Sequence, residues 1–358
     1  MSNKLRFGII GCGGIAKAKH LPALLADSRV EIIGLCDLTE QTQALKQEFD
    51  LKDVKLYEDY KELLKNPVID CVNICTPNET HASITIAALE AGKHVMCEKP
   101  MATNLEDAKE MIATAKKTGK MLTICANNRF RLDSWTLKQL CARGDLGDIY
   151  FAKAHAIRRR GVPTWGVFID KQAQGGGPVI DIGVHALDLA LWMMDNYSVH
   201  TVLACTFDHI GKVGSPANPY GNWDPQRFFV EDSGFAMITM KNKAAIILES
   251  SWALNIRDEK TAKVTLCGTK AGADMDGGLI INGEDNGNMY DQKIILEPPR
   301  IPFYKPPVTE GPVLEMRLWL DSVLEQKPPV VVPEQMFVVS SIIQAIYLSA
   351  QTGESVRF

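Results

Sequence analysis

The sequence has little of what marks membrane proteins, secreted proteins and nucleic-acid-binding domains. No apolar run approaches the roughly 20 residues that a membrane-spanning helix needs, and the amino terminus reads as a strand, not as a signal peptide. The formal net charge of −4 gives no basic surface for nucleic acid. We therefore expect a cytoplasmic protein that binds neither membranes nor nucleic acids.

Patterns of cysteine and histidine that hold metals are also missing. The 9 cysteines include no CxxC pair, and the 7 histidines are scattered along the chain. Most cysteines lie in apolar runs and are expected to be buried, reduced thiols: Cys36, Cys71, Cys75, Cys97, Cys125, Cys205 and Cys267. We expect no structural metal.

Two domains are expected, because single cores stop growing near roughly 250–300 residues and this chain has 358. Residues 1–127 alternate short β-rich runs with helical patterns, which predicts a Rossmann domain with a doubly wound parallel sheet. The expected strands are 5–10, 30–37, 71–76, 94–99 and 121–127, and the expected helices are 15–26, 79–91 and 105–118.

Residues 128–358 read as an α+β domain with an open, predominantly antiparallel sheet. The expected strands are 149–157, 201–209, 228–240, 244–252 and 263–267, with helices at 182–195, 313–325 and 333–351. We expect the last helix to pack back on the first domain. Two segments rich in Gly, Pro or Asn, 211–226 and 297–312, read as long loops.

A glycine-rich turn follows the first strand and precedes a helix. Gly11, Gly13, Gly14, Ile15 and Ala16 belong to a G-x-G-x-x-A pattern. The first glycine allows a tight turn, the second lets the backbone approach a pyrophosphate, and the alanine keeps helix and strand close. The helix N-terminus then faces the anion, so the pattern predicts a dinucleotide site.

Asp37 ends the second strand, where the adenosine ribose of a dinucleotide lies in such folds. Its carboxylate would repel the 2′-phosphate of NADP, and Leu38 supplies no cation to bind that phosphate. We expect NAD to be preferred over NADP. The alternative is that Asp37 merely caps the next helix, a role that Thr39 fills equally well.

Three separated motifs carry a family resemblance. They are residues 75–81 (CTPNETH), residues 92–100 with Glu98, Lys99 and Pro100, and the glycines 175–177 followed by Asp181, Gly183, His185 and Asp188. With them, the chain resembles the glucose–fructose oxidoreductase/inositol dehydrogenase/MocA (Gfo/Idh/MocA) family over essentially its whole length. The resemblance implies a Rossmann domain followed by an open sheet that builds the substrate pocket and often an oligomer interface.

By this resemblance, Lys99, Asp181 and His185 occupy the family's catalytic positions. The expected cofactor contacts are those of the glycine turn and Asp37, with Thr76, Pro77, Asn78, His81, Glu98, Lys99 and Asn127. Lys99 follows a strand at the carboxyl edge of the sheet, where its ammonium could lower the cost of an alkoxide. The alternative for Lys99 is a solvated lysine at a strand end.

Asp181 and His185 are four residues apart in a helical stretch, so both project from one face. The aspartate could orient the imidazole, whose other nitrogen accepts the substrate hydroxyl proton. A hydrogen-bonded core histidine with Asp181 as a helix cap is the alternative, and Asp188 binds substrate or only stabilises the helix. Lys99, Asp181 and His185 are also expected to contact substrate.

Loop residues Arg129, Arg158 and Trp165 complete the predicted substrate contacts. The tryptophan could stack on a sugar or an aglycone, and the arginines could donate to hydroxyls or a carboxylate. A solvated basic loop with a packed Trp165 fits the sequence equally well. Trp223 could reach the same pocket or an adjoining subunit.

These observations predict an NAD-dependent oxidoreductase that oxidises a secondary hydroxyl of a sugar, cyclic polyol or glycoside to a ketone. C3 of a glycoside is one such position. Two alternatives stand beside this prediction: a redox-neutral, NAD-dependent enzyme that cleaves glycosides, and a non-catalytic NAD-binding regulator. The resemblance also implies a homodimer or homotetramer.

Overall fold

A computed structural model of the chain describes residues 4–38, 40–296 and 311–358. The chain divides into two compact units. Unit 1 contains residues 1–127 and 300–337, and unit 2 contains residues 128–299 and 338–358. Most of the predicted loop 297–312 lies outside the described residues. We treat each unit by itself.

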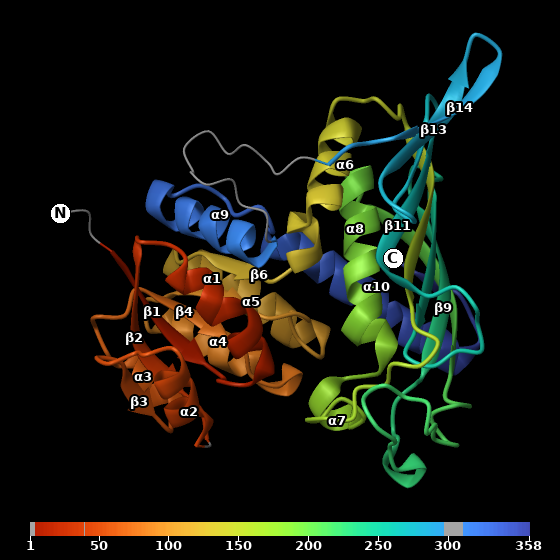
Figure 1. The fold of residues 1–358 in the computed structure, drawn as a ribbon. Helices are drawn as coiled ribbons and strands as arrows, with labels where there is room; N and C mark the ends of the chain where they lie inside the picture. Colours follow the sequence, from red (N-terminus) through yellow and green to blue (C-terminus); the bar gives the residue numbers. More distant parts are fainter. Residues whose placement is uncertain (1–3, 39, 297–310) are drawn as a thin grey trace. The chain divides into compact units, whose positions relative to one another are not determined.

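Unit 1 is built on a parallel sheet with the strand order β3-β2-β1-β4-β5-β6 (Figure 1). This is the order of a dinucleotide-binding Rossmann sheet, so the predicted fold class is confirmed. The strands are β1 (Leu5–Ile10), β2 (Val30–Cys36), β3 (Lys55–Tyr57), β4 (Cys71–Ile74), β5 (His94–Cys97) and β6 (Leu122–Ile124).

The helices of unit 1 follow the predicted capping signals where those are strong. Helix α5 (Leu105–Thr118) matches its predicted range, because the Asn104 side chain accepts the Asp107 N–H and Gly119 adopts a left-handed φ of 66°. The others are η1 (Ala16–His20), α1 (Leu21–Leu25), α2 (Gln41–Glu48), α3 (Tyr60–Leu64), η2 (Asn78–Thr80) and α4 (His81–Glu90). The short helix η3 (Asn127–Phe130) begins at Asn127 of unit 1 and continues into unit 2.

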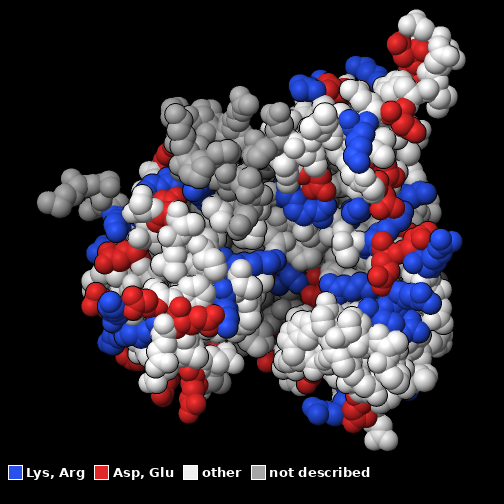
Figure 2. Space-filling view, viewed as in Figure 1, with Lys and Arg blue, Asp and Glu red and all other residues white. Residues whose placement is uncertain are grey.

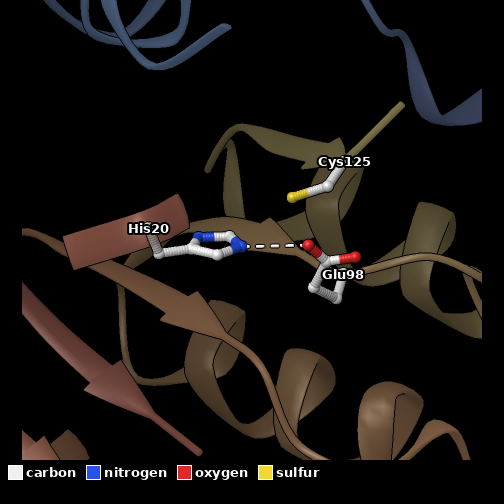
Figure 3. Close-up of side chains that lie close together, drawn as sticks. All are labelled: His20, Glu98 and Cys125. Atoms are coloured by element: carbon white, nitrogen blue, oxygen red, sulfur yellow. Dashed lines mark hydrogen bonds and ion pairs between the residues drawn. The ribbon is translucent and has the colours of Figure 1, made fainter. Parts of the chain in front are cut away.

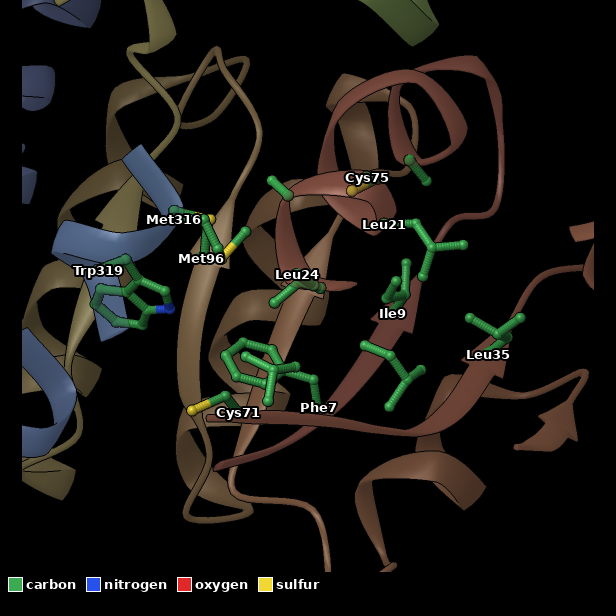
Figure 4. Packing of buried hydrophobic residues seen from close by; sticks show 14 of the residues in the cluster. Phe7, Ile9, Leu21, Leu24, Leu35, Cys71, Cys75, Met96, Met316 and Trp319 are labelled. Carbon is green, nitrogen blue, oxygen red and sulfur yellow. The ribbon is translucent and has the colours of Figure 1, made fainter. Parts of the chain in front are cut away.

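Helix α9 (Gly311–Glu325) belongs to unit 1, although it lies near the end of the sequence. Its Met316 and Trp319 pack into the cluster formed by Phe7, Leu24 and other residues of the sheet and α1 (Figure 4). Of the predicted last helix, α10 (Pro333–Thr352), only residues 333–337 fall in unit 1. The segment that returns to the first unit is therefore mainly α9, because its apolar face completes that core.

Unit 2 carries a mostly antiparallel sheet with the order β14-β13-β12-β11-β7-β10-β9-β8-β15, in which only the β7–β10 pair is parallel among the described strands. These strands are β7 (Ile149–Ile157), β8 (Val199–Phe207), β9 (Ser233–Met240), β10 (Ala245–Ser251), β11 (Lys260–Gly268), β12 (Gly272–Asp274), β13 (Ile280–Asp285), β14 (Asn288–Lys293) and β15 (Val356–Arg357). The β13–β14 hairpin extends beyond the rest of the sheet (Figure 1).

One face of this sheet is covered by helix α8 (Val184–Met194), which packs against β7 and β11. Small side chains of β7, Ala152, Ala154 and Ala156, are buried on that side, which gives the helix room to approach. The remaining helices of unit 2 are α6 (Leu132–Ala142), α7 (Lys171–Gln174), η4 (Val179–Gly183) and η5 (Pro225–Arg227).

Residues 171–194 are long and apolar enough to cross a membrane by composition, but 83% of the window lies buried inside the protein, as expected for a core helix. All nine cysteines are free. Five of the seven predicted buried thiols are buried, whereas Cys267 is half-buried and Cys205 is exposed, because its strand side faces away from the helices. Acidic and basic side chains are mixed over the visible surface (Figure 2).

Candidate cofactor site and the second glycine-rich segment

The glycine-rich turn after β1 has the backbone shape and the open space that a bound pyrophosphate requires. Gly11 has a φ of +90°, and a Cβ there would lie 2.5 Å from the carbonyl carbon of Cys75. A Cβ on Gly13 or Gly14 would meet no described atom within 4 Å. Gly11 is thus required by the protein itself, whereas Gly13 and Gly14 border open space.

Asp37 lies against this turn, as the sequence predicts. Its Oδ2 accepts the Cys12 N–H at 2.7 Å, and the Gly11 N–H donates to the Cys36 carbonyl at 2.8 Å. Burial raises the pKa of the Cys12 thiol to about 12, and the charge of Asp37 adds to this. The turn therefore presents a neutral thiol and a carboxylate at the carboxyl edge of the sheet, where NAD-type dinucleotides bind.

The loop after β4 contains the predicted contacts Thr76, Pro77, Asn78 and His81. The His81 ring is 1% exposed, with Nδ1 2.8 Å from the Pro100 carbonyl and Nε2 2.9 Å from the Thr76 carbonyl. Burial lowers the pKa of His81, and a neutral ring donates to one of these oxygens at a time. His81 therefore lies between the loops after β4 and β5 and contacts a carbonyl oxygen of each.

Glu98, another predicted cofactor contact, likewise binds other groups of the protein. Its Oε1 lies 3.0 Å from His20 Nε2 (Figure 3). Its Oε2 accepts the Lys99 N–H at 3.1 Å. Both oxygens thus bind groups of the protein, and the side chain is 7% exposed. Lys99 is half-buried and precedes a cis peptide bond to Pro100, and Asn127 begins η3 after β6. Sequence reasoning missed His20, because a single histidine in a helix carries no spacing signal.

In unit 2, the three glycines 175–177 lead into η4, a π-helical turn that continues into α8. The side chain of Glu231 accepts the N–H groups of Gly177 at 2.8 Å and Val179 at 3.1 Å, and Tyr347 donates to it at 2.9 Å. A Cβ on Gly177 would lie 2.0 Å from the Glu231 carbonyl oxygen. These glycines are needed for close packing, and π-helical turns are frequent at functional sites.

The η4 turn carries Asp181, and the first turn of α8 carries His185. Asp181 is 6% exposed, and its Oδ2 accepts the indole N–H of Trp252 at 3.0 Å. His185 is half-buried. The two residues lie on consecutive helical turns, as predicted, and a buried, hydrogen-bonded carboxylate is suited to orienting an imidazole. Trp252 was not predicted, because it lies 71 residues away in the sequence.

Arg129, a predicted substrate contact, has a structural role in unit 2. It is fully buried, and its Nε and Nη2 donate to the two oxygens of Asp188 at 2.8 and 2.6 Å. Trp192 stacks on the guanidinium at 5.3 Å. A buried carboxylate on α8 requires such a partner, so Asp188 and Arg129 neutralise each other inside unit 2.

Trp165 is 52% exposed and lies edge-on to Tyr220 at 4.9 Å and to Phe168 at 5.7 Å. Phe168 in turn contacts Trp252, whose indole holds Asp181. This aromatic row links an exposed ring to the predicted catalytic aspartate. Arg158 donates to the Gly161 carbonyl at 3.0 Å and shapes the same loop. By contrast, Trp223 is 5% exposed and donates to the Gly211 carbonyl, so it is a core residue.

Family models match both parts of the chain. Residues 5–125 match the NAD-binding Rossmann-fold domain of an oxidoreductase family, and residues 134–274 match the GFO/IDH/MocA C-terminal domain. Both matches agree with the separate folds described above.

Similar proteins include dehydrogenases of sugars and polyols. D-glucoside 3-dehydrogenase of Escherichia coli (strain K12) is 37% identical over 99% of this chain and 98% of its own length. Myo-inositol 2-dehydrogenase of Thermotoga maritima is 30% identical over 59% of this chain and 62% of its own length. A solved levoglucosan dehydrogenase bound to NADH has the same fold, with a TM-score of 0.83 at 22% identity over 99% of each chain.

Proposed function

Because this chain belongs to the Gfo/Idh/MocA family of oxidoreductases, we propose that it is an NAD-dependent dehydrogenase that oxidises a secondary hydroxyl of a sugar, cyclic polyol or glycoside to a ketone. The observation that carries this proposal is the full-length similarity to a D-glucoside 3-dehydrogenase. Among the three substrate classes it favours glycosides, with C3 as the position oxidised.

The open glycine turn supports NAD as the cofactor. The backbone of Gly11, Gly13 and Gly14 would hold the pyrophosphate, and Asp37 would accept hydrogen bonds from the adenosine ribose. When bound, the nicotinamide supplies the hydride acceptor for alcohol oxidation. The Asp37 carboxylate disfavours the extra phosphate of NADP, which makes NAD the preferred form.

The residues of the chain then have to remove a proton and stabilise charge. We assign His185 as the base that takes the hydroxyl proton and Lys99 as a cation that stabilises alkoxide character in the substrate. Asp181, fixed by Trp252, keeps His185 in the tautomer whose free nitrogen accepts that proton. Trp165 offers an exposed ring on which a sugar or aglycone can stack.

A second copy of the chain is the partner that we propose for the open face of the unit 2 sheet. Leu203 and Met237 are adjacent on β8 and β9 and are 51% and 49% exposed, and Phe207 is 40% exposed. Such a patch is typical of an oligomer interface. The free thiols and mixed surface charge fit a cytoplasmic enzyme with no affinity for nucleic acid or membranes.

The test is NADH absorbance on mixing the purified protein and NAD⁺ with glycosides, free aldoses and inositols, with NADP⁺ in parallel. We expect NADH from NAD⁺ with a glucoside as the best substrate. His185→Ala should lower kcat on the order of 10²–10⁴-fold. Release of an aglycone with no net NADH would instead support the redox-neutral cleaving enzyme, and NAD⁺ binding without either reaction would support the regulator.

A further inference from the structure

A buried chain of hydrogen bonds in unit 1 ends at the backbone of Lys99. It begins at Asn73 on β4, whose amide nitrogen lies 2.9 Å from His20 Nδ1. The other ring nitrogen of His20 binds Glu98, and the second oxygen of Glu98 accepts the Lys99 N–H. These hydrogen bonds thus connect the end of η1, a central strand and the segment that carries the proposed catalytic lysine.

These groups are removed from water. The exposed fractions are 0% for Asn73, 5% for His20 and 7% for Glu98. Burial by itself raises the pKa of Glu98, but the hydrogen bond and charge of His20, together with Lys99 and Lys19, bring it down to about 2. Glu98 is therefore a carboxylate at any pH at which the enzyme works, and His20 is its main partner.

The segment 98–100 is held at each of its residues. The Glu98 N–H donates to the Ile74 carbonyl at 2.9 Å, and the Pro100 carbonyl faces His81 at 2.8 Å. Between them, the Lys99 N–H has the Glu98 carboxylate as its acceptor. Loss of that acceptor would remove the hydrogen bond that the Lys99 N–H makes to Glu98.

Resting on the proposed dehydrogenase function, we propose that His20 is a positioning residue for Lys99, because it holds Glu98 as the carboxylate that fixes the Lys99 backbone. His20 does not itself need to touch substrate. Its effect on the reaction passes through the direction of the Lys99 side chain. Misplacement of a catalytic group by about 1 Å can cost on the order of 100-fold in rate.

Removal of His20 should make Glu98 titrate. The other ionisable groups around Glu98 are Lys19 on η1, Cys75 after β4, His81 at the start of α4, Cys97 on β5, Lys99 and Cys125 after β6. Burial keeps the three thiols protonated and lowers the pKa of His81, so only the two lysines remain to stabilise the carboxylate. In a variant without His20, the pKa of Glu98 therefore rises.

The experiment compares His20→Leu with His20→Gln across pH 5–9. For His20→Leu we expect kcat to fall on the order of 100-fold, with an additional loss of activity as the pH falls. His20→Gln should recover much of the rate, because its amide can still donate to Glu98. Glu98→Gln should lower kcat without the new acid limb, which assigns that limb to Glu98. His94→Asn is the matched control, because it changes another histidine of unit 1 that is not linked to Lys99.

A second readout does not depend on turnover. Competitive acetylation of lysines followed by peptide mass spectrometry reports the reactivity of Lys99 against Lys17 as an internal reference. In His20→Leu we expect Lys99 reactivity to change several-fold and His20→Gln to stay near wild type. If His20→Leu fails to fold, the reactivity of Lys99 in Glu98→Gln is compared with that in the wild-type protein instead.

The outcomes separate the two proposals. If the wild-type protein fails to reduce NAD⁺ with every glycoside, aldose and inositol tested, the dehydrogenase function is refuted. The labelling result still decides the role of His20. Loss of thermal stability in His20→Leu with unchanged kcat pH profile and unchanged Lys99 reactivity would show a merely structural histidine and overturn the inference.

Discussion

Two glycine-rich segments, one in each unit, use the same residue type for opposite purposes. Each leads into a π-helical turn, η1 after residues 11–14 and η4 after residues 175–177. A Cβ on Gly13 would meet nothing within 4 Å, whereas a Cβ on Gly177 would meet a carbonyl oxygen at 2.0 Å. In unit 1 the missing side chain leaves room for a ligand, and in unit 2 the protein itself fills that room.

Each π-helical turn also has a buried ion pair beside it. In unit 1 the pair is His20 with Glu98, and in unit 2 it is Arg129 with Asp188. In the first pair, Glu98 also accepts the backbone N–H of Lys99, the proposed catalytic lysine. In the second pair, Arg129 packs against Trp192, which lies on the helix that carries His185. A cluster of glycines in a sequence therefore indicates close approach, and only the structure tells whether a ligand or the protein approaches.

The largest effect is expected from Arg129→Met, which leaves the Asp188 carboxylate buried without its partner. We expect a loss of about 3–5 kcal/mol in the free energy of unfolding, measured by urea denaturation. The double variant Arg129→Met with Asp188→Leu should recover most of this loss, because no buried charge remains. Normal stability with a raised KM would instead support the substrate contact that the sequence predicts.

Gly177→Ala should have the second-largest effect, which is a loss of stability. The new methyl group would collide with the backbone of Glu231, which cannot move as freely as a side chain. Overpacking of this kind costs about 3 kcal/mol at its upper range, or a fall in Tm of roughly 6–12 °C for a domain of this size. Unchanged Tm would mean that the η4 segment can shift, and the comparison between the two glycine segments would fail.

Gly13→Ala tests the other half of the comparison. The protein has space for this methyl group, so we expect Tm to stay near wild type, whereas affinity for NAD⁺ should fall by roughly 30- to 100-fold, or about 2–3 kcal/mol. Tryptophan fluorescence titration measures both NAD⁺ and NADH binding. Gly11→Ala is the contrasting variant in the same turn, since it should impair folding rather than binding alone.

Local signals in the sequence predict much of the fold. Strand β7 and helix α5 have the predicted bounds, because alternation and caps act within a few residues. The tight turn at Gly11 and the position of Asp37 directly after β2 were likewise predicted, since a glycine-rich turn and a strand end identify them. Helix α6 and the β12–β14 strands were missed, because they are short or lack a clear period.

The supporting contacts could not be predicted from the sequence. His20 lies 53 residues from Asn73 and 78 from Glu98, and Trp252 lies 71 from Asp181. No periodic pattern links positions so far apart, so the sequence could not show which groups of the protein Glu98 and His81 bind. Arg129 read as a loop arginine for the same reason, since Asp188 is 59 residues away.

The smallest expected effect is on how the free energy of unfolding changes with pH. As the pH falls, this change should have opposite signs for His94 in unit 1 and Glu231 in unit 2. In unit 1, burial lowers the pKa of His94 from 6.5 to about 4, with help from the charge of Lys120. As the pH falls, His94 therefore takes up a proton in the unfolded chain before it does so in the folded protein. The contribution of His94 to the free energy of unfolding is present above pH 6.5 and is lost as the pH falls toward 4. For a half-buried ring the loss is about 1–2 kcal/mol after allowance for solvent.

In unit 2, burial raises the pKa of Glu231, so this group adds stability as the pH falls below its folded pKa. His94→Asn keeps an acceptor for the Met121 N–H and should flatten the loss of stability between pH 7 and 4, measured by urea unfolding followed by circular dichroism. Glu231→Gln should act in the opposite direction by removing a gain. Parallel curves for both variants would show that the two units respond to acid alike, and that His94 and Glu231 do not set the pH dependence of their stability.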